Sequence, residues 1–140
     1  METIKKSIDV EVTVNASVVK VWKYYTEPKH ILNWNTASED WHTTKSENDL
    51  KVGGKFLSRM EAKDGSFGFD FEGLYDEVKT NELIAYTLND GRKAKIAFTS
   101  VNDSTIIDVV FEAENQNSTE LQQNGWQAIL NSFKNYTETN

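Results

Sequence analysis

The sequence predicts an α+β domain in which a strongly curved antiparallel β-sheet wraps around one long helix at the C-terminal end of the chain. Two observations predict this fold. From about residue 117 to residue 136, apolar side chains recur at helical spacing and form one nearly continuous apolar face. Most of the preceding chain alternates between two faces, and short turns divide it, as in antiparallel strands. A sheet with one apolar face needs a cover, which the terminal helix provides.

The first part of the chain predicts a strand followed by two short helices. Residues 4–14 alternate as a long strand with one buried face does. Apolar residues then recur at helical spacing from Ser17 to Tyr25. A second helix is expected to begin at Pro28, because proline is favoured at the first helical position.

The middle of the chain predicts an antiparallel meander. Residues 35–40 are polar and predict a loop. Short turns such as the one at Asp64-Gly65 are typical of hairpins, because glycine adopts the positive φ that a tight turn needs. Six strands are expected, at residues 41–49, 55–62, 67 to the turn at 80, 83–88, 93–101 and 105–113. The element order is therefore β-α-α-β-β-β-β-β-β-α, in one domain that covers residues 1–140.

The terminal helix has a marked start and one unusual residue. Asn117 is the expected N-cap, and Glu120 three residues later completes a capping box. Gly125 costs about 1 kcal/mol relative to alanine inside a helix. Either a strand backbone approaches the helix closely there, or a space is left open, which makes Gly125 and Trp126 part of a cavity wall. The apolar line is expected to carry Leu121, Gly125, Ile129, Phe133 and Tyr136, with Trp126 and Leu130 beside it.

Composition excludes several classes of function. The 140 residues include 15 basic and 22 acidic ones, a net charge of −7, which argues against nucleic acid and anionic membranes as partners. The absence of cysteine excludes disulfides and thiolate metal sites. The sequence has no apolar signal core and no apolar run long enough to span a bilayer. A soluble cytoplasmic protein, monomeric or homodimeric, is expected.

Few residues point to catalysis or metal binding. His30 and His42 have no further ligand at metal-site spacing, so no metal and no cofactor are expected. No serine lies in a Gly-x-Ser-x-Gly motif, and no catalytic residue is assigned. By strand alternation, Asp70 and Glu72 lie on the face opposite Phe67, Phe69 and Phe71 and are expected to face water. A bulge at Gly73 would reverse the direction of these side chains locally. Arg59 is expected to face outward in the same way.

Large aromatic rings are numerous for a chain of this length. They either fill the core or line a pocket, since ligand sites are mostly apolar with a few polar groups. Tyr86 and Trp126 each carry a polar atom that can orient a ligand. The rings in question are Trp34, Trp41, Phe56, Phe67, Phe69, Phe71, Tyr86, Phe98, Trp126 and Phe133.

Short motifs follow one another in a specific order over nearly the whole chain. They are Val21-Trp22, Thr26-Glu27-Pro28, Trp34, Val52-Gly53-Gly54-Lys55-Phe56, Met60, Asp64-Gly65, Phe71-Glu72-Gly73, Glu77-Val78, Glu82-Leu83-Ile84, Tyr86-Thr87, Gly125-Trp126 and Leu130. This order resembles the homologues of the activator of heat-shock-protein-90 ATPase, in the START-like (birch-pollen-allergen-like, SRPBCC) superfamily. The resemblance implies a helix-grip fold with a hydrophobic cavity. It is not extended to a chaperone function, because the eukaryotic co-chaperones carry a separate chaperone-binding domain for which this chain has no room.

Three functions are compatible with the sequence. The leading one is binding of a hydrophobic small molecule, a lipid or an aromatic, polyketide-like compound, between the sheet and the C-terminal helix. The alternatives are an enzyme of the cyclase or hydratase type in the same cavity, and a protein-interaction module associated with a chaperone. The expected ligand contacts are Trp34, Phe56, Met60, Phe69, Phe71, Tyr86, Phe98, Trp126, Leu130 and Phe133.

Overall fold

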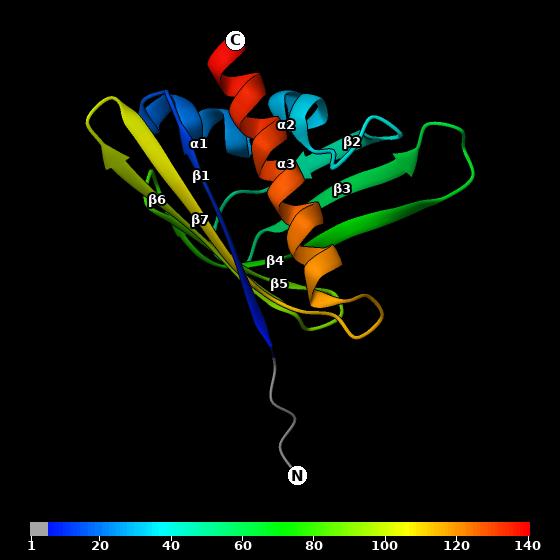
Figure 1. Ribbon diagram of the computed structural model, residues 1–140. Helices are drawn as coiled ribbons and strands as arrows, with labels where there is room; N and C mark the ends of the chain where they lie inside the picture. Colours follow the sequence, from blue (N-terminus) through cyan, green and yellow to red (C-terminus); the bar gives the residue numbers. More distant parts are fainter. Residues whose placement is uncertain (1–5) are drawn as a thin grey trace.

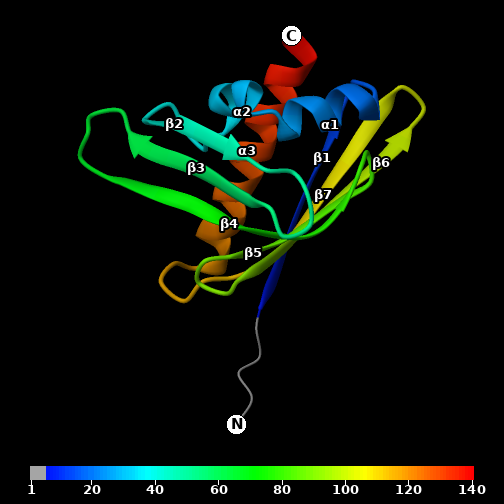
Figure 2. The same cartoon turned by 180° about the vertical axis from the view of Figure 1, so that it is seen from behind.

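The computed structural model describes residues 6–140 and has the α+β architecture predicted from the sequence. A strongly curved antiparallel sheet faces one long C-terminal helix, and two short helices lie beside the C-terminal half of that helix (Figures 1 and 2). The strands are β1 (Ser7–Val14), β2 (Trp41–Asn48), β3 (Lys55–Ala62), β4 (Gly68–Lys79), β5 (Leu83–Leu88), β6 (Lys93–Val101) and β7 (Ser104–Glu112). The helices are α1 (Val18–Thr26), α2 (Pro28–Trp34) and α3 (Thr119–Thr139).

The seven strands form one sheet in the order β1-β7-β6-β5-β4-β3-β2. Strands β2 to β7 form the predicted meander, and β1 pairs with β7, so β1 and β2 are the two edges. The register shifts between Thr43 and Lys45 in β2, and between Tyr75 and Glu77 in β4. Because a bulge bends its strand, these shifts add to the curvature of the sheet. The bulge in β4 therefore follows Tyr75 and does not lie at Gly73.

Helix α3 lies along the edge strand β1. An edge strand presents unpaired backbone carbonyls, which need other partners. Three α3 side chains donate to three alternate carbonyls of β1. The pairs are Gln123 Nε2 to Asp9 O (3.3 Å), Gln127 Nε2 to Glu11 O (2.9 Å) and Lys134 Nζ to Thr13 O (2.7 Å). These bonds hold the helix toward one side of the sheet, away from the strands at the other edge.

The start of α3 differs by one residue from the prediction. Ser118 is the N-cap, and its Oγ accepts a hydrogen bond from Leu121 N at 3.1 Å. Asn117 instead donates to the carboxylate of Glu114. Leu121 was expected on the buried line but is 58% exposed, whereas Gln122 is buried. The Gln122 amide bonds to backbone atoms of the preceding loop, so a satisfied polar side chain occupies the buried position.

Two further expectations concern the ends of the elements. The predicted strand at residues 4–14 includes Ile4, which lies outside the described residues. Residues Ile8 to Val14 alternate between exposed and buried, as the sequence predicts. No helix within residues 6–140 combines the length and the apolar character needed to cross a membrane.

Candidate functional site

A cavity of about 500 Å³ lies between the inner face of the sheet and helix α3. Helix α2 and the loop after it border one end, and the β5–β6 turn and the β7–α3 loop border the other. Strands β3, β4 and β5 contribute aromatic side chains, and α3 contributes the opposite wall. Such a size lies within the range of small-molecule sites in proteins, about 300–1,000 Å³.

Eight of the ten residues expected to contact a ligand line this cavity. They are Trp34, Phe56, Met60, Phe69, Phe71, Tyr86, Trp126 and Leu130. They come from α2, β3, β4, β5 and α3, and their apolar side chains face one common space.

Phe98 and Phe133 do not line the cavity, and their expected placement there is wrong. The Phe98 ring packs edge-on against Trp22 of α1, with centroids 5.2 Å apart. Phe133 is completely buried, and its ring packs edge-on against Tyr25 and Trp34. Both lie where α1 and α2 cover the sheet, so neighbouring helices fill the space in front of them.

Gly125 lies on a side of α3 where no neighbouring atom is close. A Cβ atom built on Gly125 would have no heavy atom within 4 Å. The interpretation that a strand backbone approaches closely at this point is therefore wrong, and the glycine borders the cavity. The next residue, Trp126, stacks on Phe111 of β7 at 4.1 Å and meets Phe71 of β4 edge-on at 6.0 Å. Trp126 thus bridges the helix to both sides of the curved sheet.

An aromatic rim of Trp41, Phe67 and Phe69 lies at the open side of the cavity, and two of these residues, Trp41 and Phe69, line the cavity itself. Trp41 of β2 lies 6.0 Å from both Phe67 and Phe69, measured between ring centroids. Phe67 is 62% exposed and Phe69 is 41% exposed, although alternation places both on the inner face. Figure 1 shows that strands β3 and β4 extend beyond the part of the sheet that α3 covers. Phe67 lies just before β4 and Phe69 lies at its start. Leu121 of α3 also borders the cavity.

Polar groups are concentrated at two places in the cavity wall. The first lies beneath α1, where the hydroxyl of Tyr75 donates to Asn48 Oδ1 and Asn48 Nδ2 donates to Thr26 O at 2.5 Å. Tyr25 and Tyr86 line the same region. Burial raises the pKa of all three tyrosines above the ordinary value. Their hydroxyls are therefore protonated and neutral over the whole range of working pH.

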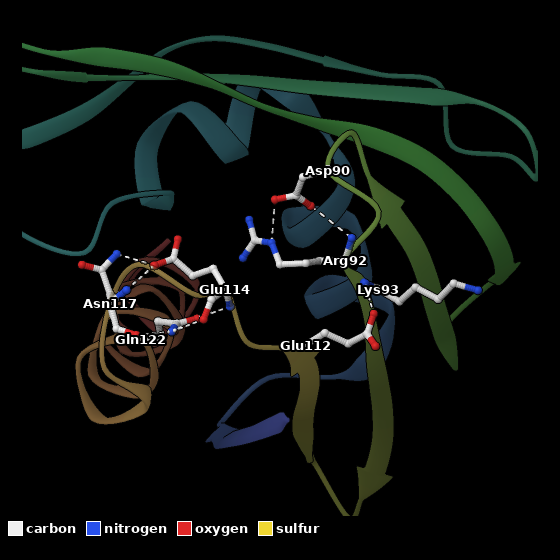
Figure 3. Close-up of polar contacts among 7 residues, drawn as sticks. All are labelled: Asp90, Arg92, Lys93, Glu112, Glu114, Asn117 and Gln122. Carbon is white, nitrogen blue, oxygen red and sulfur yellow. Dashed lines mark hydrogen bonds and ion pairs between the residues drawn. The ribbon is translucent and has the colours of Figure 1, made fainter. Parts of the chain in front are cut away.

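The second polar place is the end bordered by the β5–β6 turn and the β7–α3 loop. Figure 3 shows Arg92 reaching from the turn toward the loop that carries Glu114 and Asn117. Arg92 Nε lies 2.7 Å from Asp90 Oδ2, and the Arg92 side chain is 26% exposed. Gln122 of α3 holds the loop, since its Oε1 accepts from Glu114 N at 2.9 Å and its Nε2 donates to Asn117 O at 2.9 Å.

Sequence patterns carry little signal for these polar groups. Strand alternation places Tyr75 on the same face as Phe69 and Phe71, but no sequence pattern assigns it to a ligand site. Tyr25 was assigned only to the apolar side of a short helix. Asn48 and Arg92 follow no motif, and only the curvature of the sheet brings them to the cavity.

The remaining candidate residues lie elsewhere. His30 contacts no part of the cavity: its Nδ1 lies 2.8 Å from the hydroxyl of Tyr136, and its ring stacks on Tyr24 at 3.9 Å. Burial lowers the pKa of His30. Asp70 faces away from the cavity and pairs with Arg59 at 3.3 Å, as strand alternation predicts. Residues 6–140 contain no group of three or more histidine, aspartate or glutamate side chains placed to hold a metal ion.

Comparison with known proteins connects this geometry to a family. The family model described as Activator of Hsp90 ATPase homolog 1-like protein matches residues 15–138. The chain belongs to this family. An AHSA1-like protein from Aeromonas hydrophila has 40% sequence identity, covers 96% of this chain and 93% of its own, and superposes with a TM-score of 0.89. A search of curated proteins finds none that matches this chain.

Two further solved structures extend the comparison. A protein from Cytophaga hutchinsonii has 59% identity, covers 95% of this chain and 92% of its own, and gives a TM-score of 0.83. A protein from Chromobacterium violaceum has 21% identity, covers 94% and 96% of the two chains, and gives a TM-score of 0.85, which shows a shared fold alone. The Activator of Hsp90 ATPase homolog 1-like family and its helix-grip fold, inferred from the order of short motifs, are thereby confirmed.

Proposed function

We propose that the protein binds a hydrophobic small molecule in the cavity between the sheet and α3. The observation that carries this proposal is the open space in front of Gly125, opposite a wall of aromatic side chains. A glycine in mid-helix costs stability, and here no close contact offsets that cost. The simplest explanation for glycine at position 125 is that it keeps the cavity open.

The lining also has the character of a ligand site. Apolar side chains cover most of it, and a small number of polar groups stand at defined places, as in small-molecule sites generally. Ligands with a lipid chain or with aromatic rings match the shape and the chemistry of this wall. Membership of the Activator of Hsp90 ATPase homolog 1-like family supports a ligand-binding domain of the START-like type.

A titration with the neutral fluorescent reporter N-phenyl-1-naphthylamine tests the proposal. We expect saturable one-to-one binding with a blue-shifted, enhanced emission. Gly125→Leu places an apolar side chain in the cavity and is expected to abolish the signal. Asn124→Leu adds the same side chain to the exposed neighbouring position and is the matched control. Equal reporter binding by both variants would show that the reporter occupies another place and would refute the proposal.

The aromatic rim favours protein interaction as a second function. Phe67 is exposed beside Trp41 and Phe69 and does not border the cavity. Exposed apolar clusters of this kind mark interaction surfaces in many soluble proteins. Phe67→Ser is expected to leave reporter binding unchanged and to weaken binding of a protein partner. Loss of reporter binding in Phe67→Ser would instead assign Phe67 to the ligand site.

A further inference from the structure

The inner end of the cavity contains two tyrosine hydroxyls, of the half-buried Tyr25 and the buried Tyr86, that have no hydrogen-bond partner within residues 6–140. Tyr86 is 7% exposed. Polar groups inside proteins are nearly always paired with protein atoms or with water. Two hydroxyl donors without a protein partner are therefore available to a molecule in the cavity.

These hydroxyls remain accessible from the cavity. In the described part of the chain, the side-chain atoms that lack both a partner and any accessible surface are Asp108 Oδ1 and Thr137 Oγ1. The Tyr25 and Tyr86 hydroxyls are not among them, although both side chains are unpaired and line the cavity. Each hydroxyl therefore meets the empty space of the cavity.

The two hydroxyls belong to one cluster of three tyrosines. Tyr86 of β5 lies directly opposite Tyr75 of β4 in the register, and the ring of Phe56 packs against both, at 4.8 and 5.1 Å. Tyr25 reaches the same region from α1. The Tyr75 hydroxyl donates to Asn48 and is satisfied. The two remaining hydroxyls stay available to a bound molecule.

The electrostatic surroundings favour an acceptor group on that molecule. Burial raises the pKa of Tyr86, the nearby Tyr25 and Tyr75 raise it further, and Arg92 acts in the opposite direction. Protonated hydroxyls donate hydrogen bonds and therefore attract an acceptor that carries a partial negative charge. A fully ionised carboxylate is disfavoured at this depth, because a buried charge needs a paired countercharge.

We propose that Tyr25 and Tyr86 recognise the carbonyl oxygen of a neutral, otherwise apolar ligand. This inference rests on the proposed function and specifies the ligand as a ketone or similar carbonyl compound of lipid or aromatic type. The carbonyl oxygen accepts hydrogen bonds from the two hydroxyls, while the aromatic wall and α3 enclose the apolar body. The tyrosines act as specificity determinants, because a hydrocarbon of the same shape leaves both donors unpaired.

A pair of probes with one skeleton tests the inference. 9-Fluorenone and fluorene differ by a single carbonyl oxygen, and both are small enough for the cavity. Their affinities are measured by displacement of N-phenyl-1-naphthylamine. We expect the wild-type protein to prefer fluorenone by roughly tenfold, which corresponds to about 1.4 kcal/mol. Fluorenone labelled with ¹³C at the carbonyl is expected to show a downfield shift of that resonance on binding.

Variants that delete only the hydroxyls give the decisive comparison. In the Tyr25→Phe/Tyr86→Phe protein the preference for fluorenone and the ¹³C shift are expected to disappear. Tyr24→Phe is the matched control, because the Tyr24 hydroxyl bonds to Asn140 O outside the cavity. The lost hydroxyls have no partner in the protein, so folding is expected to persist; if the double variant does not fold, the single variants are each expected to lose part of the preference.

The outcomes separate this inference from the proposed function. Equal affinity for the two probes in the wild-type protein, or a preference that survives the double substitution, would overturn the carbonyl assignment while leaving cavity binding intact. Failure of both probes and of the reporter to bind would overturn the proposed function itself, and the carbonyl assignment with it.

Discussion

Replacement of Gly125 by alanine should stabilise the protein, which is unusual for a substitution at an inward-facing position. A Cβ at this position has no heavy atom within 4 Å, so the added methyl group causes no steric conflict. The residue lies in the middle of α3, where alanine is favoured over glycine by about 1 kcal/mol. We therefore expect the free energy of unfolding to rise by about 1 kcal/mol, and Tm by about 4 °C in a domain of this size.

Leucine at the same position should stabilise the fold further. Its side chain fills part of the cavity, and each buried methylene group contributes about 0.8 kcal/mol. Together with the gain in helix propensity, the increase is expected to be about 2 kcal/mol. Urea denaturation followed by circular dichroism measures both variants. The Leu variant should lose reporter binding while gaining stability, because the same space serves both effects.

Gly73→Ala provides the control for this reasoning. A Cβ on Gly73 collides with the backbone carbonyl of Thr87 and comes within 3.1 Å of the Phe56 ring. The same substitution should therefore destabilise the protein there, by about 1–3 kcal/mol. If Gly125→Ala lowered the stability as Gly73→Ala does, α3 would have to pack directly on the sheet, and the cavity at Gly125 would not exist in solution.

Three other predictions follow from individual contacts. Asp9 and partial burial raise the pKa of Asp108 from 3.8 to about 6, so the folded state holds a proton that the unfolded state releases, and stability falls as pH rises through this window. Asp108→Asn should therefore stabilise the protein by about 1 kcal/mol at pH 7 but not at pH 4. An equal gain at both pH values in urea titrations would contradict this assignment. Gln127→Ala leaves the Glu11 carbonyl without its donor and should lower the unfolding free energy by about 1 kcal/mol. Asn124→Ala, on the exposed face of α3, should leave the unfolding free energy unchanged. Equal effects of the two variants would show that the edge contacts do not stabilise α3. Phe133→Leu should lower the unfolding free energy by about 1–2 kcal/mol and leave the affinity for the reporter within about twofold of the wild-type value, since Phe133 lies in the core. A larger loss of reporter affinity at unchanged stability would return Phe133 to the ligand site.

Local patterns predicted the elements well because their causes are local. Strand alternation has a period of two, so it identified the inner face of β3 and β4, including the inward Phe56 and Tyr75 and the outward Arg59 and Asp70, without knowledge of the sheet. Turn residues marked the hairpins, because Gly65 and Gly91 adopt the positive φ that their turns require. The order of short motifs added the family, which supports the same helix-grip fold.

The sequence alone determined which strand residues face inward, and only the tertiary structure decided which of them meet another side chain and which meet empty space. Phe71 and Phe98 look alike in the sequence, since both alternate correctly within a strand. Phe71 borders the cavity and Phe98 is covered by α1, because α3 runs along the edge of β1 and the short helices cover only one end of the sheet. That path depends on hydrogen bonds between residues more than a hundred positions apart, such as Gln127 and Glu11. No local pattern encodes such a contact, whereas side-chain alternation depends only on neighbouring residues.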